Sequence, residues 1–237
     1  MHGCIIYGGS FNPVHIAHLR LAIEVSWLLA DYADRLEFVP SARHPQKKAT
    51  SMLPFALRME MLQASIKDLP AMTCNGIEGK RDNVSYTIDT LKYYLQNWHR
   101  SELFFLVGSQ DYALMNSWHK WRELPGMCNL VVAPRGEYNF MDFFKTTKRL
   151  WPDCADMPST PDTLLRRCPT AGCLKLTDNT SAFYLPVQWL PISSSHIRQL
   201  WREGKNPEWL LPPVALNILN QNQSLVNSCW NEEEHIC

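Results

Sequence analysis

The sequence predicts an α/β fold built on a parallel β-sheet, and three observations support this prediction. Short apolar runs rich in β-branched and aromatic residues recur along the chain. Longer segments with helical periodicity fill the gaps between these runs, as in βαβ units. With 237 residues, of which 46% are hydrophobic and 19% charged, the chain is large enough to bury a substantial core. These features predict a Rossmann-like, doubly wound parallel sheet.

The expected elements follow in order along the chain. Strands are expected at residues 3–7, 36–39, 103–107, 130–133 and 183–189. Helices are expected at residues 18–30, 55–67, 86–98, 194–203 and 214–220. In sheets of this class, ligands bind beyond the carboxyl ends of the strands, where the strand order reverses. The motifs described below all fall at strand-to-helix junctions, so we expect them at that edge.

Two internal stretches and the last residues depart from this alternation. Residues 40–54 contain Pro, Ser and Lys without apolar periodicity and predict a long loop. Residues 137–178 are too weakly patterned for a core of their own and predict an insertion. The segment from Gln221 onward is polar and predicts a frayed tail. We therefore expect a single domain over residues 1–222 with an insertion at about 137–178, and a polar tail over residues 223–237.

Composition and charge argue against several classes of protein. The 23 Lys and Arg residues balance the 23 Asp and Glu residues, and a neutral total argues against extended nucleic-acid binding. No apolar run is long enough to span a membrane, and the first residues enter a strand-like run rather than a signal peptide. The 8 cysteines are scattered and form no C-x-x-C pair. We expect a soluble, cytoplasmic protein with reduced cysteines and with neither a membrane nor a nucleic-acid partner.

The most informative motif joins the first strand to the first helix. In one-letter code it runs GGSFNPVHIAH over residues 8–18. Gly8 and Gly9 let the backbone approach a ligand without an intervening Cβ. The N-terminus of the following helix offers N–H groups and a positive dipole to an anion. His15 and His18 lie on one face of the first helical turn, where both imidazoles can meet the same phosphates. The motif therefore predicts a nucleotide-phosphate site.

Two other interpretations of this motif are weaker. A glycine-rich turn with two surface histidines would show the same residue types without any function. A zinc site made by His15 and His18 is a second alternative, but no Cys or carboxylate lies at ligand spacing nearby.

A second motif, ISSSHIR over residues 192–198, precedes the helical pattern near the end of the chain. Ser193 and Ser194 can cap free N–H groups at the helix start and can bond phosphate oxygens. Arg198 lies one turn into the helix, where its planar donor fork can reach the same anion. Serine-rich caps and solvated arginines are ordinary features of helices, so this motif alone does not establish a phosphate site.

The middle of the chain carries candidates for holding a flat, anionic group. Thr87, in SYTIDTL over residues 85–91, opens a helix and could present its hydroxyl and N–H to a carboxylate. Gly108 to Asp111 follow an apolar strand, and Trp118 could stack on a flat heterocycle. The structural alternatives are an ordinary N-cap at Thr87 and core packing of Trp118.

Together the two terminal motifs resemble the two signatures of the nucleotidylyltransferase superfamily, in the right order. Over most of its length the chain is similar to the bacterial nicotinate mononucleotide adenylyltransferase family, which joins an adenylyl group from ATP to nicotinate mononucleotide. The other matching elements are the loop Pro45-Gln46-Lys47, Arg58, the SYTIDTL helix start, the turn at 108–111, Trp118, residues 131–135 and LPPV over residues 211–214. The resemblance implies an α/β fold of the nucleotidylyltransferase type and an enzyme of NAD biosynthesis.

The resemblance also implies a role for each site residue. The residues expected to bind ATP are Gly8, Gly9, Ser10, Phe11, His15, His18, Gly108, Asp111, Ser193, Ser194 and Arg198. The residues expected to bind the mononucleotide are Asn12, Lys47, Tyr86, Thr87, Trp118 and Arg135. The expected catalytic residues are His15, His18 and Arg198. Mg²⁺ is expected to enter with ATP, held by phosphate oxygens and water rather than by a protein cage. The sequence leaves open whether the chain forms a homo-oligomer.

Two positions depart from the family pattern. The family loop usually reads Pro-His-Lys or Pro-His-Arg, whereas Gln46 stands at the histidine position here. The family turn is usually Gly-x-Asp, whereas Gln110 stands at the aspartate position and Asp111 comes one residue later. Asp111 is therefore assigned to ATP through a shifted turn. Neither change affects the phosphate motifs, but both bear on the choice of substrate.

Three alternative functions stay open at this point. Another superfamily enzyme, such as a nicotinamide mononucleotide or phosphopantetheine adenylyltransferase or a cytidylyltransferase, is the nearest. Trp118 argues against phosphopantetheine, which has no flat ring to stack. A nucleotide-binding module without catalysis should show a damaged phosphate motif, yet both motifs are intact. A structural or interaction protein is supported only by the insertion and the polar tail.

Overall fold

The computed structural model describes residues 3–43, 51–81 and 84–231 of the chain. The predicted substrate residue Lys47 and the unusual Gln46 lie outside the described residues.

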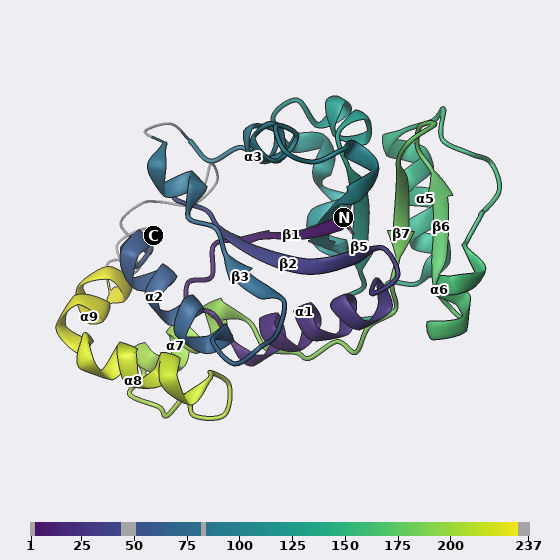
Figure 1. Cartoon of the computed structure of the whole chain (residues 1–237). Coiled ribbons are helices and arrows are strands. Elements are labelled where there is room, and N and C mark those ends of the chain that lie inside the picture. Colours follow the sequence, from purple (N-terminus) through teal and green to yellow (C-terminus); the bar gives the residue numbers. More distant parts are fainter. Residues whose placement is uncertain (1–2, 44–50, 82–83, 232–237) are drawn as a thin grey trace. The chain divides into compact units, whose positions relative to one another are not determined.

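A seven-stranded sheet forms the centre of the fold (Figure 1). In chain order the strands are β1 (Gly3–Gly9), β2 (Ala33–Pro40), β3 (Met72–Cys74), β4 (Leu103–Gly108), β5 (Asn129–Ala133), β6 (Gly172–Lys175) and β7 (Ser181–Tyr184). Their order across the sheet is β3-β2-β1-β4-β5-β7-β6. β1 pairs with β4, β4 with β5 and β5 with β7 in parallel, whereas β6 pairs antiparallel with β7. The order reverses after β1, as in a doubly wound sheet, so the predicted fold class is confirmed.

Helices connect these strands and flank the sheet. The α-helices are α1 (Ile16–Leu28), α2 (Phe55–Ile66), α3 (Thr87–Tyr94), α4 (Ser109–Ala113), α5 (Phe140–Leu150), α6 (Asp162–Arg167), α7 (Ser194–Arg202), α8 (Pro213–Gln221) and α9 (Gln223–Asn231). Short 3₁₀ helices are η2 (Ile77–Lys80), η3 (Arg100–Glu102), η4 (Met115–Ser117) and η5 (Trp121–Gly126).

The chain divides into two compact units. Unit 1 comprises Met1–Gly8, Leu21–Glu37 and Tyr86–Trp189. Unit 2 comprises Gly9–Arg20, Phe38–Ser85 and Leu190–Cys237.

The core of unit 1 consists of the central parallel strands. β4 and β5 are apolar along almost their whole length, and every residue of Leu103–Val107 is buried. Strands buried on both faces need such continuous apolar runs, which explains why the sequence pattern revealed them. The parallel register places Tyr7 beside Leu106 and Gly108 beside Ala133, so β1, β4 and β5 end at the same edge of the sheet. That edge carries the unit 1 site residues.

The segment predicted as an insertion adds two helices and a strand to unit 1. α5 begins at an Asn139 cap, whose side chain accepts hydrogen bonds from the backbone N–H groups of Met141 and Asp142. α5 packs against β7, and α6 and β6 follow it (Figure 1). Gly172 on β6 is in such close contact with the Phe140 ring that a Cβ would collide with it. The division into one domain with an insertion stays a prediction.

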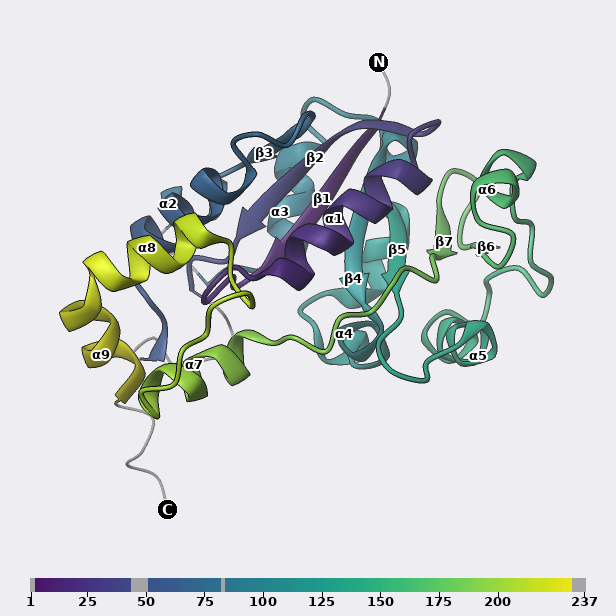
Figure 2. The same cartoon turned by 90° about the horizontal axis from the view of Figure 1, so that it is seen from below.

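Unit 2 gathers helices from both ends of the chain. α2 packs against α8, and α9 packs against both α7 and α8 (Figure 2). Trp201 on α7 donates from its indole Nε1 to the Asn227 side chain on α9 at 2.8 Å. The Trp201 ring also meets the Trp230 ring edge to face, with 5.7 Å between ring centroids. These contacts hold α7 and α9 together.

The structure corrects two expectations about the second half of the chain. The last parallel strand ends at Tyr184 rather than at residue 189, because Pro186 has no N–H to continue the ladder. The segment after Gln221 was expected to fray, but Gln223–Asn231 form α9. Val226 and Trp230 lie one helical turn apart and are fully buried. The polar residues between them conceal this apolar pair in the sequence.

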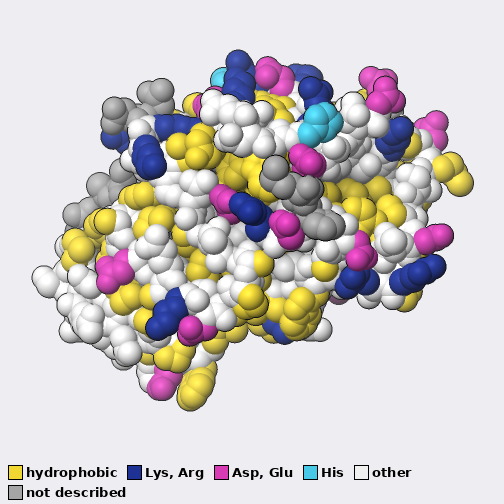
Figure 3. All heavy atoms as spheres, in the orientation of Figure 1, with side chains coloured by type: hydrophobic (Ala, Val, Ile, Leu, Met, Phe, Trp, Pro, Cys, Tyr) yellow, Lys and Arg dark blue, Asp and Glu magenta, His cyan; other side chains and the backbone are white. Residues whose placement is uncertain are grey.

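The surface carries both signs of charge. On the face drawn in Figure 3, Lys and Arg side chains are interspersed with Asp and Glu side chains. None of the helices within the described residues has the length and apolar character needed to cross a bilayer.

Candidate active site

The loop after β1, in unit 2, has its backbone carbonyl groups held by donors from elsewhere in the unit. The Gly9 carbonyl accepts the Ser41 backbone N–H at 2.8 Å. The Ser10 carbonyl accepts the Arg58 guanidinium Nη1 at 2.7 Å. Both donors come from outside the motif, and the sequence analysis assigned a role to neither. Ser41 and Arg58 hold the loop through hydrogen bonds to backbone carbonyls, and such bonds cannot be recognised from a pattern of residues in the sequence.

The C-terminal motif holds the next part of the same loop. Arg198 donates from Nη1 to the Asn12 carbonyl at 3.0 Å and from Nη2 to the Ser195 hydroxyl at 3.3 Å. The Ser194 hydroxyl donates to the Pro13 carbonyl at 2.9 Å. The two motifs, far apart in sequence, are therefore in direct contact within unit 2. A phosphate site needs N–H donors rather than carbonyl oxygens facing the anion. The hydrogen bonds from Arg198 and Ser194 keep the carbonyls of Asn12 and Pro13 directed toward the protein's own donors.

The Asn12 side chain fixes the segment that precedes α2. Its Oδ1 accepts the Leu53 N–H at 3.0 Å, and its Nδ2 donates to the Ser51 carbonyl at 3.1 Å. Asn12 is 3% exposed. Both ends of the amide thus bond to the protein backbone, which gives Asn12 an organising role in the loop, while its contact with the mononucleotide stays a prediction.

The two histidines of the N-terminal motif lie face to face. The His15 and His18 rings are stacked, with centroids 3.5 Å apart and an angle of 21° between the planes. The His15 backbone N–H donates to Nδ1 of His18 at 3.2 Å. Because Nδ1 accepts this hydrogen bond, the proton of a neutral His18 ring is on Nε2. His18 therefore presents an N–H donor on the far side of its ring, as a phosphate contact requires.

Phe11 supports the histidines from inside the loop. It is buried, and its ring meets the His18 ring edge to face at 5.0 Å and the Phe38 ring at 5.6 Å. Its φ of 43° lies in the left-handed region, which a bulky residue enters only when its surroundings fix it there. The ring folds back over Gly9, where a Cβ would lie 3.0 Å from a ring carbon. Gly9 is therefore needed for close packing of the loop.

The N-terminus of α7 adds further donors to the unit 2 cluster. Ser193 is its N-cap, and the Ser193 hydroxyl accepts the His196 N–H at 3.2 Å. Since the Ser194 hydroxyl proton is donated to Pro13, Ser194 can offer an anion its backbone N–H rather than its hydroxyl. The structure thus brings together His15, His18, Ser193, Ser194 and Arg198.

The unit 1 residues predicted to bind ATP lie at the carboxyl ends of β1 (Gly8) and β4 (Gly108 and Asp111), and Arg135, predicted to bind the mononucleotide, follows β5. A Cβ on Gly108 would lie 3.4 Å from Nε of Arg135, so that guanidinium lies close to the glycine. The buried Ser109 hydroxyl accepts the Arg135 backbone N–H at 2.9 Å and fixes the turn after β5. Ser109 is a further residue that the sequence analysis missed, although its hydroxyl follows a strand-ending glycine.

The charges near this edge act on the hydroxyl of Tyr7. Burial raises the pKa of Tyr7 above its usual value of 10.0, Arg135 opposes this rise and Asp111 adds to it. The predicted pair of Arg135 and Asp111 is therefore close enough to the end of β1 to influence the same group. Both charged residues are exposed, and a Cβ on the nearby Gly8 would lie 3.4 Å from the Phe105 ring.

The residues predicted to hold the nicotinate ring also belong to unit 1. Thr87 is the first residue of the eight-residue helix α3, and Tyr86 is its N-cap without a side-chain cap bond. The Tyr86 ring contacts the His119 ring with 4.5 Å between centroids and an angle of 33° between the planes. Trp118 is half-buried and meets Phe105 edge to face at 6.1 Å. An uncapped helix start and a half-buried indole are suited to a carboxylate and a flat ring.

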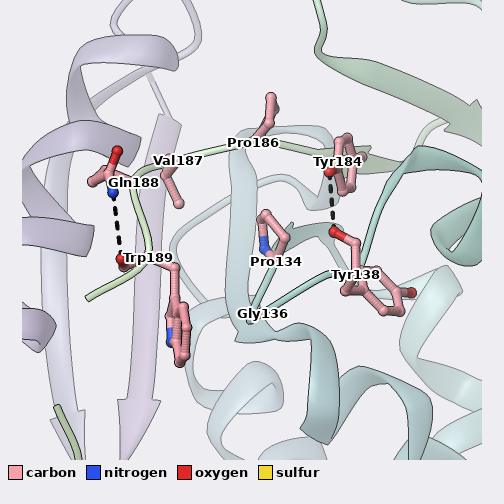
Figure 4. A pocket seen from close by; sticks show the side chains of 8 residues that line it. All are labelled: Pro134, Gly136, Tyr138, Tyr184, Pro186, Val187, Gln188 and Trp189. Atoms are coloured by element: carbon pink, nitrogen blue, oxygen red, sulfur yellow. Dashed lines mark hydrogen bonds between the residues drawn. The ribbon is translucent and has the colours of Figure 1, made fainter. Parts of the chain in front are cut away.

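A shallow cavity of about 370 Å³ opens in unit 1 beyond β5 and β7 (Figure 4). Its lining residues are Pro134, Gly136, Tyr138, Tyr184, Pro186, Val187, Gln188 and Trp189. The Tyr184 hydroxyl donates to the Tyr138 carbonyl at 3.3 Å across one side of it. Three of the lining side chains are aromatic.

The described ranges contain no cluster of three or more His, Cys, Asp and Glu side chains able to hold a metal ion. In unit 2 the loop and α7 offer N–H and guanidinium donors, which suit phosphate oxygens rather than a bare cation.

Comparison with known proteins agrees with this architecture. Residues 6–200 match the model of the cytidylyltransferase-like family. A protein of Geobacter metallireducens named probable nicotinate-nucleotide adenylyltransferase is 34% identical over 219 residues, which cover 91% of this chain and 95% of that protein. A protein of the same name from Geotalea daltonii is 36% identical over 222 residues, which cover 92% of this chain and 95% of that protein.

Solved structures show the same fold. The Plasmodium falciparum nicotinic acid mononucleotide adenylyltransferase complexed with NaAD superimposes with a TM-score of 0.66 at 17% identity, covering 95% of this chain and 98% of the other. The structure of a Vibrio parahaemolyticus protein described as a nicotinate-nucleotide adenylyltransferase gives a TM-score of 0.57 at 17% identity, covering 93% of this chain and all of the other.

Proposed function

Since this chain belongs to the cytidylyltransferase-like family, and within it to the nicotinate-nucleotide adenylyltransferases, we propose that it transfers the adenylyl group of ATP to nicotinate mononucleotide. The products are nicotinate adenine dinucleotide and pyrophosphate. The observation that carries the proposal is the pair of hydrogen bonds from Arg198 and Ser194 to the carbonyls of Asn12 and Pro13. They join the two phosphate motifs into one donor-rich cluster in unit 2.

The reaction needs no nucleophilic side chain. A phosphate oxygen of the mononucleotide attacks the α-phosphorus of ATP in line and forms the new P–O bond. The bond from the α-phosphorus to the bridging oxygen breaks, and pyrophosphate leaves with that electron pair. Catalysis then consists of positioning the two phosphates and stabilising the negative charge that spreads over them.

Each unit 2 residue has a distinct part in this scheme. His18 donates from Nε2 to a phosphate oxygen in the transition state, because its Nδ1 is already occupied by the His15 N–H. His15, buried beneath it, holds that ring in place by stacking. Arg198 and the N–H groups at the start of α7 neutralise the departing pyrophosphate.

The unit 1 residues provide the recognition of the bases. We assign the nicotinate carboxylate to the N–H groups at the start of α3, and the pyridine ring to Trp118 and Tyr86. A carboxylate satisfies those donors, whereas a neutral amide would place its own N–H donors against them. This argument favours the acid over the amide substrate. The cavity lined by Tyr138, Tyr184 and Trp189 is our candidate for the adenine ring.

Mg²⁺ belongs to the proposal as a companion of ATP. The cation would bind phosphate oxygens and water and would neutralise charge on the leaving pyrophosphate. The donors of Arg198 and α7 fit the remaining phosphate oxygens. We also propose a cytoplasmic location, on the sequence evidence given above.

The test is the release of pyrophosphate from MgATP with three acceptors offered in turn. Nicotinate mononucleotide should give the highest kcat/KM, and nicotinamide mononucleotide a lower one for the reason of charge given above. A higher kcat/KM with phosphopantetheine than with either mononucleotide would show that the proposed substrate is wrong. ATP binding without turnover of any acceptor would indicate a nucleotide-binding module instead.

A further inference from the structure

Arg58 is a fully charged side chain placed almost entirely inside unit 2. It is 1% exposed and lies in the first turn of α2. Its Nε donates to the Leu53 carbonyl at 2.9 Å, and its Nη1 donates to the Ser10 carbonyl at 2.7 Å. The guanidinium carbon lies 5.5 Å from the centroid of the Phe55 ring. The side chain thus links the first turn of α2 to the phosphate loop.

Burying a cation costs free energy, so the contacts of a buried cation indicate its role. Burial lowers the pKa of Arg58 to about 10, and the nearby carboxylate of Glu78, itself 7% exposed, opposes that decrease. Arg58 therefore keeps its charge at neutral pH. An apolar side chain of similar volume could fill the same space, but it could not donate to two backbone carbonyls in a fixed fork.

The geometry of the peptide unit shows what the bond to Ser10 achieves. In a planar trans peptide the C=O and the following N–H point in opposite directions. When Arg58 draws the Ser10 carbonyl toward itself, the N–H of Phe11 is turned away from Arg58. Phe11, the next residue, has a φ of 43° in the left-handed region. The carbonyl that Arg58 holds and the N–H of Phe11 therefore belong to the same peptide unit.

We propose that Arg58 is a positioning residue for catalysis, which orients the Ser10–Phe11 peptide so that its N–H faces the phosphates of the nucleotide. It does not touch the substrate. Asn12 and Arg58 act on the same segment, since they bond the N–H and the carbonyl of Leu53 respectively. This proposal rests on the proposed adenylyl transfer for its kinetic readout, but its binding readout is independent of that function.

The test compares two conservative variants of the buried pair. Arg58→Lys keeps the positive charge beside Glu78 but loses the fork that bonds Leu53 and Ser10 together. We expect a rise of about 10-fold in KM for ATP and a fall of about 10-fold in kcat, because a misplaced loop costs both binding and positioning. KM for nicotinate mononucleotide should change little, whereas the melting temperature should fall because the Leu53 and Ser10 carbonyls lose their donor.

Glu78→Gln is the matched control, because it removes the partner charge while leaving both carbonyl bonds of Arg58 in place. It should lower the melting temperature, since a buried cation loses its counter-charge. Its kcat and its KM for ATP should stay within about twofold of the wild type, since the loop is still held. A purely structural role for Arg58 predicts the reverse, with the loss of activity following the loss of stability in both variants. That result, or wild-type kinetics in folded Arg58→Lys, would overturn the proposal.

Binding of inorganic tripolyphosphate, measured by calorimetry without any mononucleotide, separates this proposal from the proposed function. Arg58→Lys should weaken tripolyphosphate binding about 10-fold, and Glu78→Gln should not. If the wild type failed to release pyrophosphate with nicotinate mononucleotide, the proposed function would fail while this comparison still tested Arg58. Equal tripolyphosphate affinity in Arg58→Lys and the wild type would contradict the positioning role alone.

Discussion

The phosphate cluster of unit 2 and the ring-binding surface of unit 1 are built in contrasting ways. In unit 2, carbonyls of the loop are bonded by Ser41, Arg58, Arg198 and Ser194, and His15 and Asn12 are almost fully buried. In unit 1, Trp118, Tyr86 and Thr87 are all partly exposed, and their described contacts are chiefly ring against ring.

The difference reflects what each part has to recognise. Phosphates are small and highly charged, and their recognition depends on N–H directions that change with any rotation of a peptide. A loop for phosphates must therefore be fixed on many sides. A flat ring is recognised mainly by contact area and by one anionic group, so a few aromatic faces and a helix start suffice. We expect substitutions in unit 2 to reduce kcat and substitutions in unit 1 to raise KM.

The largest effect should follow from His18→Ala. The variant loses a donor that we assign to the transition state, and kcat should fall by roughly 10²–10³, as when one oxyanion donor is removed. The melting temperature should be close to that of the wild type, because His18 is only partly buried. Steady-state kinetics and thermal denaturation measure the two quantities.

The control for this prediction is His119→Ala, which removes an exposed histidine that contacts the Tyr86 ring in unit 1. It should leave kcat nearly unchanged. If His18→Ala retained wild-type turnover, the assignment of His18 to the transition state would be wrong, and the contrast between the two regions would lose its clearest support.

A smaller effect of a different kind is expected from Trp118→Ala. KM for nicotinate mononucleotide should rise about 10-fold because a stacking face is lost, while kcat and KM for ATP should change little. Trp27→Ala, which removes an indole that is 59% exposed on α1, provides the matched control. Initial rates at varied concentrations of each substrate distinguish the outcomes. A rise in KM for ATP alone would place Trp118 on the other nucleotide.

The smallest effect concerns a buried cysteine on β1, outside both regions. Burial, with a smaller contribution from the nearby Glu37, raises the pKa of the Cys4 thiol on β1 from 9.0 to about 12. The unfolded thiol ionises at lower pH than the folded one, so this contribution to stability is complete below pH 9 and is lost as pH rises toward 12.

Urea denaturation at pH 8, 9 and 10 would measure this loss, which is at most about 1.4 kcal/mol per pH unit for one group. Cys4→Ala should be less stable at pH 8 because of the cavity, but its stability should fall less steeply with pH. Parallel slopes for the two proteins would show that another group controls alkaline unfolding.

Much of the fold was predictable because buried parallel strands leave continuous apolar runs in the sequence. The expectations that failed have identifiable causes. Pro186 ends β7 early although apolar residues continue. α5 was missed because its capping box uses Asn139 and Asp142 rather than the commoner Ser or Thr with Glu. α9 was missed because Val226 and Trp230 are separated by polar residues.

The site was predictable to the extent that its residues form local motifs. The two phosphate motifs were recognisable, and the structure brings their residues into contact. Arg58, Ser41 and Ser109 could not be given roles, because each acts through a hydrogen bond to a distant main-chain group. Such bonds depend on the path of the chain and not on any spacing along it.

The hydrogen bond from Arg198 to Asn12 spans 186 positions of the sequence, and this has a consequence for synthesis on the ribosome. The glycine-rich segment emerges from the ribosome before Ser194 and Arg198, whose hydrogen bonds hold the loop after it. These two residues emerge only when most of the polypeptide has been made. Contacts of such long range are slow to form and leave the early product incomplete. A nascent chain that stops before α7 should therefore be unable to retain nucleotide, however well its first strands have paired.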